Sequence, residues 1–256
     1  MDVLHIKGND LWKYFGSDFV ASRGITGIYG KERLFSKKND VYKIEVESVT
    51  GIGWYVLKKY RGKDRYSRMK NELYFYSLLQ ENGLQVPHIF YKGEGVLVTR
   101  FTGDRTLLDY ITQEENQAPG RARPDSTGLA KWLPLLAGSL RYIYDFNRTL
   151  REASGKSYIL NDMNFRNFVL AGGDIFRVDL EECRAGLVEE DMGKFMAFFL
   201  TYDPPFTTWK RSVSESMKSL CRDIMDMDIT RIELEIKKEL IRMDKRRDQN
   251  PDQAFL

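Results

Sequence analysis

The stretch LNDMNFRNFVLAGGDIFRVDLEE, residues 160–182, says most about the fold of this chain. Two short runs in it, 168–170 and 175–178, are rich in β-branched and aromatic residues. They flank a four-residue segment, Ala171-Gly172-Gly173-Asp174. A glycine-containing loop of about four residues between two such runs predicts a β-hairpin.

Three polar residues are placed to meet at the open end of this hairpin. Asn167 comes just before the first strand and Asp179 just after the second, while Asp162 lies five residues before Asn167. Two carboxylates and a carboxamide are hard oxygen ligands of the kind that Mg²⁺ prefers. One carboxylate would remain to accept a proton from an attacking hydroxyl. The alternative is a surface hairpin whose ends are polar because water solvates them.

A second pair of residues lies upstream. In GWYVLKKY, residues 53–60, strand alternation puts Lys58 on the same face as Trp54 and Val56. In the next helical segment, Glu72 shares a face with a run of apolar side chains. An ammonium and a carboxylate that each continue an apolar row need partners. We therefore expect Lys58 to pair with Glu72, although each could instead be an ordinary surface charge.

The first hundred residues predict a β-rich lobe. Residues 25–61 read as strands, 65–80 as a helix that ends at Asn82-Gly83, and 88–101 as two further strands joined through Gly93-Glu94-Gly95. We expect this lobe to span residues 1–101.

The remaining residues, 102–256, predict a mainly helical lobe. Residues 114–128 are polar, contain two prolines and predict a long surface loop. Residues 129–153 have strong helical periodicity, and residues 207–248 are helical in pattern and end in a basic run.

Composition indicates an ordinary soluble protein. The chain has 256 residues, 42% apolar and 30% charged, with a net charge of +3 that gives no reason to expect nucleic acid as a partner. Its two cysteines, Cys183 and Cys221, have no metal-like spacing and fit a reducing cytoplasm. The start of the chain does not resemble a signal peptide, and no apolar run is long enough for a transmembrane segment.

Taken in order, Val56-Leu57-Lys58, Glu72, Asp162-x-x-x-x-Asn167 and Val178-Asp179 resemble the motifs of the protein-kinase-like superfamily. Their order and spacing are most similar to its aminoglycoside phosphotransferase branch and to the lipopolysaccharide-sugar and RIO-type kinases. The resemblance covers about residues 38–200. It implies an α+β, bilobed fold, with an antiparallel β N-lobe that binds nucleotide and a mainly helical C-lobe that binds the acceptor and carries out catalysis.

The resemblance also implies roles for individual residues. Asp162 would be the catalytic carboxylate, and Asn167 and Asp179 would bind Mg²⁺. Lys58 would contact the phosphates of ATP, with Glu72 as its anchor. The other implied contacts are Ser36 and Asn39 in the phosphate loop, Thr99 and Phe101 in the hinge beside adenine, and Asp191 as a buried brace of the catalytic loop.

The chain departs from the superfamily pattern at two places. Leu160 stands where a histidine is usual, and the phosphate loop, residues 35–42, contains no glycine. The resemblance implies an ATP- and Mg²⁺-dependent phosphotransferase that moves the γ-phosphoryl group to an acceptor hydroxyl. The two departures support an alternative to this activity, a catalytically weak kinase-fold binding or regulatory module. A kinase-like protein associated with nucleic acid has only the basic tail in its favour.

The length of the segment between Asp179 and Asp191 bears on the chemical class of the acceptor. Eleven residues separate Asp179 from Asp191, with no Ala-Pro-Glu segment, which favours a small molecule or glycan over a protein as acceptor. A protein acceptor stays possible, and the sequence leaves the oligomeric state open.

Overall fold

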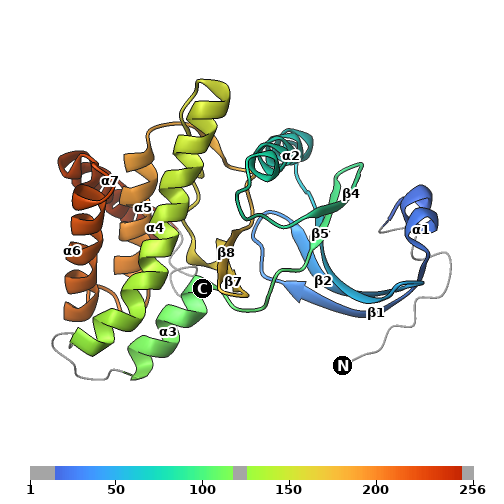
Figure 1. Cartoon of the computed structure of the whole chain (residues 1–256), viewed down its shortest axis with the longest axis horizontal. Helices are drawn as coiled ribbons and strands as arrows, with labels where there is room; N and C mark the ends of the chain where they lie inside the picture. Colours follow the sequence, from blue (N-terminus) through green and yellow to red (C-terminus); the bar gives the residue numbers. More distant parts are fainter. Residues whose placement is uncertain (1–14, 118–125, 250–256) are drawn as a thin grey trace. The chain divides into compact units, whose positions relative to one another are not determined.

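A computed structural model describes residues 15–117 and 126–249 (Figure 1). It divides into two compact units. Unit 1 comprises Met1–Gly103 and Phe176–Glu181, and unit 2 comprises Asp104–Ile175 and Glu182–Leu256. The chain thus passes between units three times, where the sequence had suggested one division after residue 101.

Unit 1 is built on a five-stranded antiparallel sheet of order β1-β2-β3-β5-β4. The strands are β1 (Ile25–Leu34), β2 (Asp40–Ser48), β3 (Gly51–Lys59), β4 (Ile89–Gly93) and β5 (Val96–Arg100). Two helices accompany it, α1 (Ser17–Arg23) and α2 (Arg65–Glu81). The predicted strands and the predicted helix of this part are confirmed, whereas α1 was not predicted.

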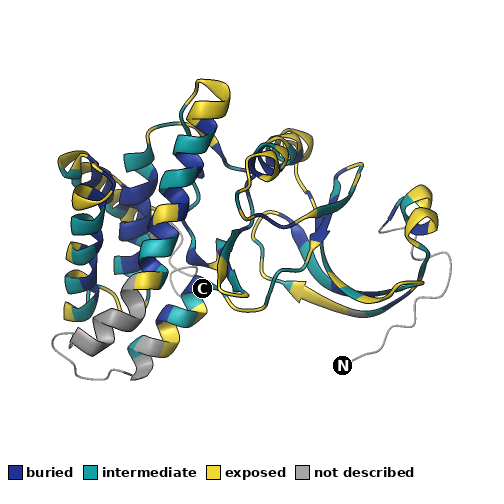
Figure 2. Ribbon diagram, in the orientation of Figure 1, coloured by how far each residue is buried: buried dark blue, intermediate teal, exposed yellow. Residues whose placement is uncertain are grey.

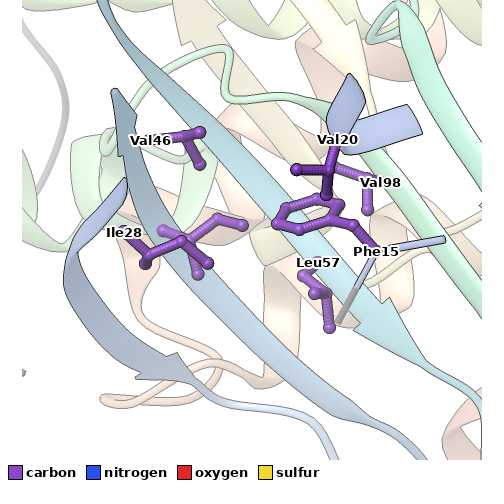
Figure 3. Close-up of a cluster of buried hydrophobic side chains, with 7 residues drawn as sticks. Phe15, Val20, Ile28, Val46, Leu57 and Val98 are labelled. Carbon is purple, nitrogen blue, oxygen red and sulfur yellow. The ribbon is translucent and has the colours of Figure 1, made fainter. Parts of the chain in front are cut away.

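Register explains how the two faces of the sheet differ. Leu57 lies opposite Tyr42 on β2 and Val98 on β5, so these three share one face. That face carries the hydrophobic core of unit 1, where Phe15 and Val20 meet strand residues (Figure 3). The buried members of this core are Phe15, Val20, Ile28, Ile44, Val46, Leu57 and Val98.

Lys58, one residue later, points to the other face, opposite Val41 and Leu97. The lysine therefore does continue an apolar row, as the alternation predicted.

The segment Phe176–Glu181 belongs to unit 1 because hydrogen bonds attach it there. The Arg177 amide donates to the Gln85 carbonyl (3.2 Å), and the Leu180 amide donates to Oε1 of Glu72 (3.3 Å). The side chain of Asn71 donates to the carbonyl of Glu181 (3.0 Å). This attachment brings Asp179 into the same unit as Lys58.

Unit 2 is mainly helical. Its helices are α3 (Leu107–Gln117), α4 (Ser126–Ser154), α5 (Val188–Thr201), α6 (Thr208–Asp223) and α7 (Ile229–Gln249), with a 3₁₀ turn, η2 (Phe165–Asn167). Two small antiparallel sheets accompany them: β6 (Tyr158–Ile159) with β9 (Arg184–Ala185), and β7 (Phe168–Ala171) with β8 (Asp174–Arg177), whose last two residues belong to unit 1. The predicted hairpin is confirmed, and its turn uses Gly172 and Gly173 at φ 62° and 91°.

Helix α5 is the central element of unit 2. Seven consecutive residues, Asp191–Ala197, are buried, and Figure 2 shows most of the helix in dark blue. It packs against α4, α6 and α7. An aromatic cluster joins it to η2: the rings of Phe165 and Phe195 lie 4.5 Å apart between centroids.

Two predictions about unit 2 were wrong in their bounds. The loop predicted over 114–128 is wrong at both ends, because residues 114–117 belong to α3 and 126–128 to α4, and residues 118–125 lie outside the described part. Tertiary contacts explain the first difference, since Glu115 accepts hydrogen bonds from Lys210 and Thr207. The predicted helical tail is two helices, interrupted at residues 224–228 where Asp226 has φ 51°.

Within residues 15–117 and 126–249, no helix combines the length and apolar character needed to cross a membrane.

Candidate functional site

Lys58 is the centre of an ionic cluster in unit 1. Its Nζ lies 2.6 Å from Oε2 of Glu72, 2.6 Å from Oδ1 of Asp179 and 3.0 Å from Oε2 of Glu181. The expected pair of Lys58 and Glu72 is therefore present, with both residues buried. The sequence placed Asp179 at a hairpin mouth, and the structure places its carboxylate on the same ammonium group.

The charges of this cluster shift one another's proton affinity. Burial alone would lower the pKa of Lys58, but the three carboxylates outweigh it and hold that pKa well above its usual value. Burial raises the pKa of Glu72, and Lys58 opposes this only in part. Burial also acts to raise the pKa of Asp179, but the nearby ammonium of Lys58 holds it below its ordinary value. Asp179 is thus an ionised carboxylate at neutral pH.

The cluster has the oxygen donors that a divalent cation requires. Carboxylate oxygens of Glu72, Asp179 and Glu181 lie within 4.8 Å of one another. Glu72 and Glu181 have side chains only 2% and 3% exposed, whereas the side chain of Asp179 is 36% exposed. Of these three carboxylates, Asp179 is the one open to an incoming ion, and hard oxygen ligands suit Mg²⁺.

The phosphate-loop candidates lie in the turn between β1 and β2. Asn39 is buried, and its side chain is engaged at both ends: Nδ2 donates to Glu181 (2.8 Å) and Oδ1 accepts from Arg68 (2.9 Å). Ser36 Oγ accepts a hydrogen bond from the Asn39 amide (3.2 Å). This turn is therefore connected to the Lys58 cluster through Glu181, with side chains fixing a loop that has no glycine.

The hinge candidates lie at the end of β5. Thr99 is buried and sits opposite Val56 on β3. The Phe101 amide continues the strand pairing by donating to the Trp54 carbonyl (3.1 Å). Lys43 Nζ lies 4.2 Å from the centre of the Phe101 ring and 5.0 Å from that of Trp54, within the range of cation–π attraction.

Asp162 and Asn167 are together in unit 2. Oδ2 of Asp162 accepts from Nδ2 of Asn167 (3.0 Å), and Oδ1 accepts from the backbone amide of Asn164 (3.0 Å). Both carboxylate oxygens are thus oriented by their own loop. Asn164 in turn accepts from the Arg166 amide and from the hydroxyl of Tyr202, which follows α5.

Asp191 braces this loop from the first turns of α5. Its two carboxylate oxygens accept the backbone amides of Leu160 (2.6 Å) and Asn161 (2.9 Å). Leu160 stands where the superfamily pattern has histidine, and its apolar side chain is fully buried.

Sequence reasoning missed Arg68 and the role of Glu181. Glu181 was not among the predicted site residues, yet it is buried and pairs with Lys58 and with Arg68 (2.9 Å). Its position two residues after Asp179 gave no signal of this, because Asp179 has φ 61° and residues 178–181 are not part of a strand. Its contact with Asn39 joins residues 142 apart in the sequence, which no local pattern reveals.

No family model matches the chain, and neither does any curated protein. Solved structures do match. An aminoglycoside phosphotransferase, 14% identical, aligns over 96% of this chain and 92% of its own with a TM-score of 0.56. An ethanolamine kinase of Plasmodium vivax, 11% identical, aligns over 91% and 77% with a TM-score of 0.51.

These similarities show the fold. The chain has an α+β, kinase-like fold that it shares with these two solved structures. The predicted fold class is confirmed. At sequence identities of 11% and 14%, the fold is what the chain shares with these proteins.

Proposed function

We propose that the protein is an ATP- and Mg²⁺-dependent phosphotransferase that moves the γ-phosphoryl group to an acceptor hydroxyl. The observation that carries this proposal is the Lys58 cluster, because its ammonium group is bonded to both Glu72 and Asp179 within a kinase-like sheet. A fixed, fully protonated lysine suits contact with nucleotide phosphates. Unit 1 would then be the nucleotide-binding part of the chain, with Ser36, Asn39, Thr99 and Phe101 at its phosphate and adenine contacts.

Unit 2 would supply catalysis and acceptor binding. In the transfer step, the acceptor hydroxyl oxygen bonds to the γ-phosphorus and the bond from that phosphorus to the β,γ-bridging oxygen breaks, so ADP leaves. The hydroxyl proton passes to the carboxylate of Asp162, whose two oxygens are already oriented by Asn164 and Asn167. Asp179 and Asn167 are the proposed ligands of Mg²⁺, which neutralises charge on the phosphates when bound.

The acceptor we propose is a small molecule or glycan. The segment between Asp179 and Asp191 is short and contains the two-residue strand β9 and the start of α5, which leaves little chain for a peptide-docking segment. The solved proteins that share the fold are named as kinases of aminoglycosides and ethanolamine. Both cysteines are buried free thiols, which agrees with a cytoplasmic setting.

A second candidate is a kinase-fold binding module with weak catalysis. The contacts of Asn39 favour this candidate. Its side-chain amide is hydrogen-bonded to Glu181 and Arg68, and it would have to give up these partners in order to bind phosphate.

A phosphotransfer screen separates the two candidates. Purified protein is incubated with γ-labelled ATP and ethanolamine, aminoglycosides, simple sugars or a generic protein, with Mg²⁺ or with EDTA. If the protein is an enzyme, we expect the label to appear on an acceptor in the presence of Mg²⁺ and not in the presence of EDTA. Nucleotide binding by calorimetry without transfer to any acceptor or to water would favour the binding module.

A further inference from the structure

The residue before Asp162 has an unusual backbone and unusual partners. Asn161 has φ 67°, in the left-handed region that asparagine tolerates better than most residues. Its side-chain carbonyl oxygen accepts hydrogen bonds from Nζ of Lys194 and from Nε of Arg184 (3.1 Å). Lys194 also lies 3.4 Å from the backbone carbonyl oxygen of Asn161. Two cations thus converge on one neutral amide.

Lys194 makes these contacts from inside unit 2. It lies on α5, is 5% exposed, and burial lowers its pKa although Asp191 opposes that shift. Burying an ammonium group is costly unless its donors are used, so this lysine has a strong requirement for the Asn161 oxygen atoms. Arg184, on β9, is held in turn by Glu190 at the start of α5 (2.8 Å). The two donors therefore come from fixed elements.

These contacts fix the main chain next to Asp162. Asp191 holds the amides of residues 160 and 161, while Lys194 and Arg184 hold the side chain of residue 161. The bonds from Asn164 and Asn167 orient the Asp162 carboxylate, whereas its main-chain amide donates to the Leu160 carbonyl (2.9 Å), so the preceding residues hold its backbone. The neighbouring residue, Leu160, is apolar and can donate or accept only through its backbone.

We propose that Asn161 is the positioning residue of Asp162, clamped by Lys194 and Arg184 so that the carboxylate meets the acceptor hydroxyl in a productive geometry. The expected effect on the reaction rate rests on the proposed phosphotransferase function. The contacts that hold Asn161 can be tested without an activity measurement. A displacement of about 1 Å at a reacting group can cost about a hundredfold in rate.

Three substitutions of Asn161 separate its backbone role from its side-chain role. Asn161→Gly keeps the left-handed conformation and removes the acceptor. Asn161→Ala removes the acceptor and strains the backbone. Asn161→Asp keeps a short side chain with an acceptor oxygen for both cations. Arg184→Ala is a fourth variant, at a side chain that is 46% exposed and therefore tolerant of truncation. Val213→Ala, a core truncation on α6 in the same unit, controls for lost stability.

Kinetics are measured with γ-labelled ATP, Mg²⁺ and the best acceptor from the screen, or water if none is found. We expect Asn161→Gly and Asn161→Ala to lower kcat about tenfold to a hundredfold with the KM for ATP changed less than about twofold. Arg184→Ala should give a smaller decrease, and Asn161→Asp should stay within about threefold of the parent. Parent-like kcat in Asn161→Gly, with Asp162→Asn inactive, would overturn the inference and leave the proposed function intact.

Amide hydrogen exchange provides the readout that does not depend on activity. Asn161→Gly and Lys194→Met should speed amide exchange at residues 160–167 at least about tenfold. The control variant, Val213→Ala, should not speed exchange at these residues more than in the rest of unit 2. A parent that transfers no phosphate would contradict the proposed function, while this exchange pattern would still support the clamp. Unchanged exchange in both clamp variants would overturn it.

Discussion

One ammonium group and three carboxylates define the chemistry of unit 1 at the scale of single residues. Lys58, Glu72, Asp179 and Glu181 carry a formal net charge of −2 (one positive, three negative), and Arg68 on Glu181 reduces it to −1. Buried charges of this kind are stable only while every partner is present.

Replacing Lys58 should therefore destabilise the fold as well as remove a phosphate contact. Lys58→Met leaves three carboxylates facing one another, and we expect a loss of about 3 kcal/mol in the free energy of unfolding at neutral pH. Lys59→Met, an exposed lysine at the next position of β3, is the control and should change it by less than about 0.5 kcal/mol. Equal urea midpoints for the two variants would show that the cluster does not stabilise unit 1.

The sequence revealed the members of this site that break a local pattern. Lys58 and Glu72 were found because each puts a charge in an apolar row. Asn39 was assigned to phosphate through the family resemblance, while its observed contacts, Glu181 and Arg68, come from distant parts of the chain. Asn161 was not among the predicted site residues, and nothing in the sequence indicated that Lys194 and Arg184 contact it.

At the scale of elements, the N-terminus of α5 depends on Glu190. Its carboxylate accepts from the Leu187 amide (3.1 Å) and pairs with Arg184. Burial acts to raise the pKa of Glu190, but these hydrogen bonds outweigh it and hold that pKa below its ordinary value. A lowered folded-state pKa means that the stabilisation is present above the unfolded-state pKa and is lost as pH falls through the folded-state value.

Glu190→Gln should therefore flatten the pH dependence of stability in the acid range. The parent should lose free energy of unfolding between about pH 5 and pH 3, and the variant should lose less over the same window. Urea titrations at several pH values measure this, with Glu189→Gln as the neighbouring control. Parallel curves for parent and Glu190→Gln would contradict the assignment.

Two helical glycines test how closely the elements of unit 2 pack. A Cβ on Gly193 in α5 would meet Cβ of Glu235 at 2.5 Å and the amide nitrogen of Ile236 at 2.9 Å, both on α7. A Cβ on Gly138 in α4 would meet only the flexible end of Ile175, at 3.1 Å. We expect Gly193→Ala to cost about 2 kcal/mol or more by overpacking. Gly138→Ala should be neutral or slightly stabilising through helix propensity.

Chemical denaturation of both variants measures the difference. Similar stabilities would mean that α7 can move away from α5 at little cost.

Elements with strong periodicity were predictable, and elements set by tertiary contacts were not. The strands of 40–48 and 51–59 and the helix of 65–81 follow from alternation and apolar spacing. Helix α3 continues through 114–117 because Glu115 binds Lys210, a contact between distant residues. Helix α1 is only seven residues long, too short to give a periodic signal, and its one buried side chain, Val20, joins the core.

At the scale of the whole molecule, the proposed reaction needs groups from both units. Unit 1 carries Lys58 and Asp179, and unit 2 carries Asp162 and Asn167. Binding and catalysis should therefore respond differently to substitutions in the two units.

Mg²⁺-ATP should stabilise the protein through Asp179. At 100 times its dissociation constant, a ligand that binds only the folded state stabilises it by about 2.7 kcal/mol, which raises the melting temperature measurably. Asp179→Ala should abolish that rise, because an ionised ligand of a divalent cation is lost. Asp174→Ala, an exposed aspartate of the same hairpin, should retain it. An undiminished rise in Asp179→Ala would remove Asp179 from the proposed metal site.

The most direct test of phosphoryl transfer is the turnover of Asp162→Asn. This substitution keeps the shape of the side chain and removes its charge, so it affects the transition state and not the binding of nucleotide. Single-turnover transfer from γ-labelled ATP should slow by about two or more orders of magnitude, with nucleotide affinity nearly unchanged. Transfer as fast as in the parent protein would contradict the enzyme assignment and favour the binding module.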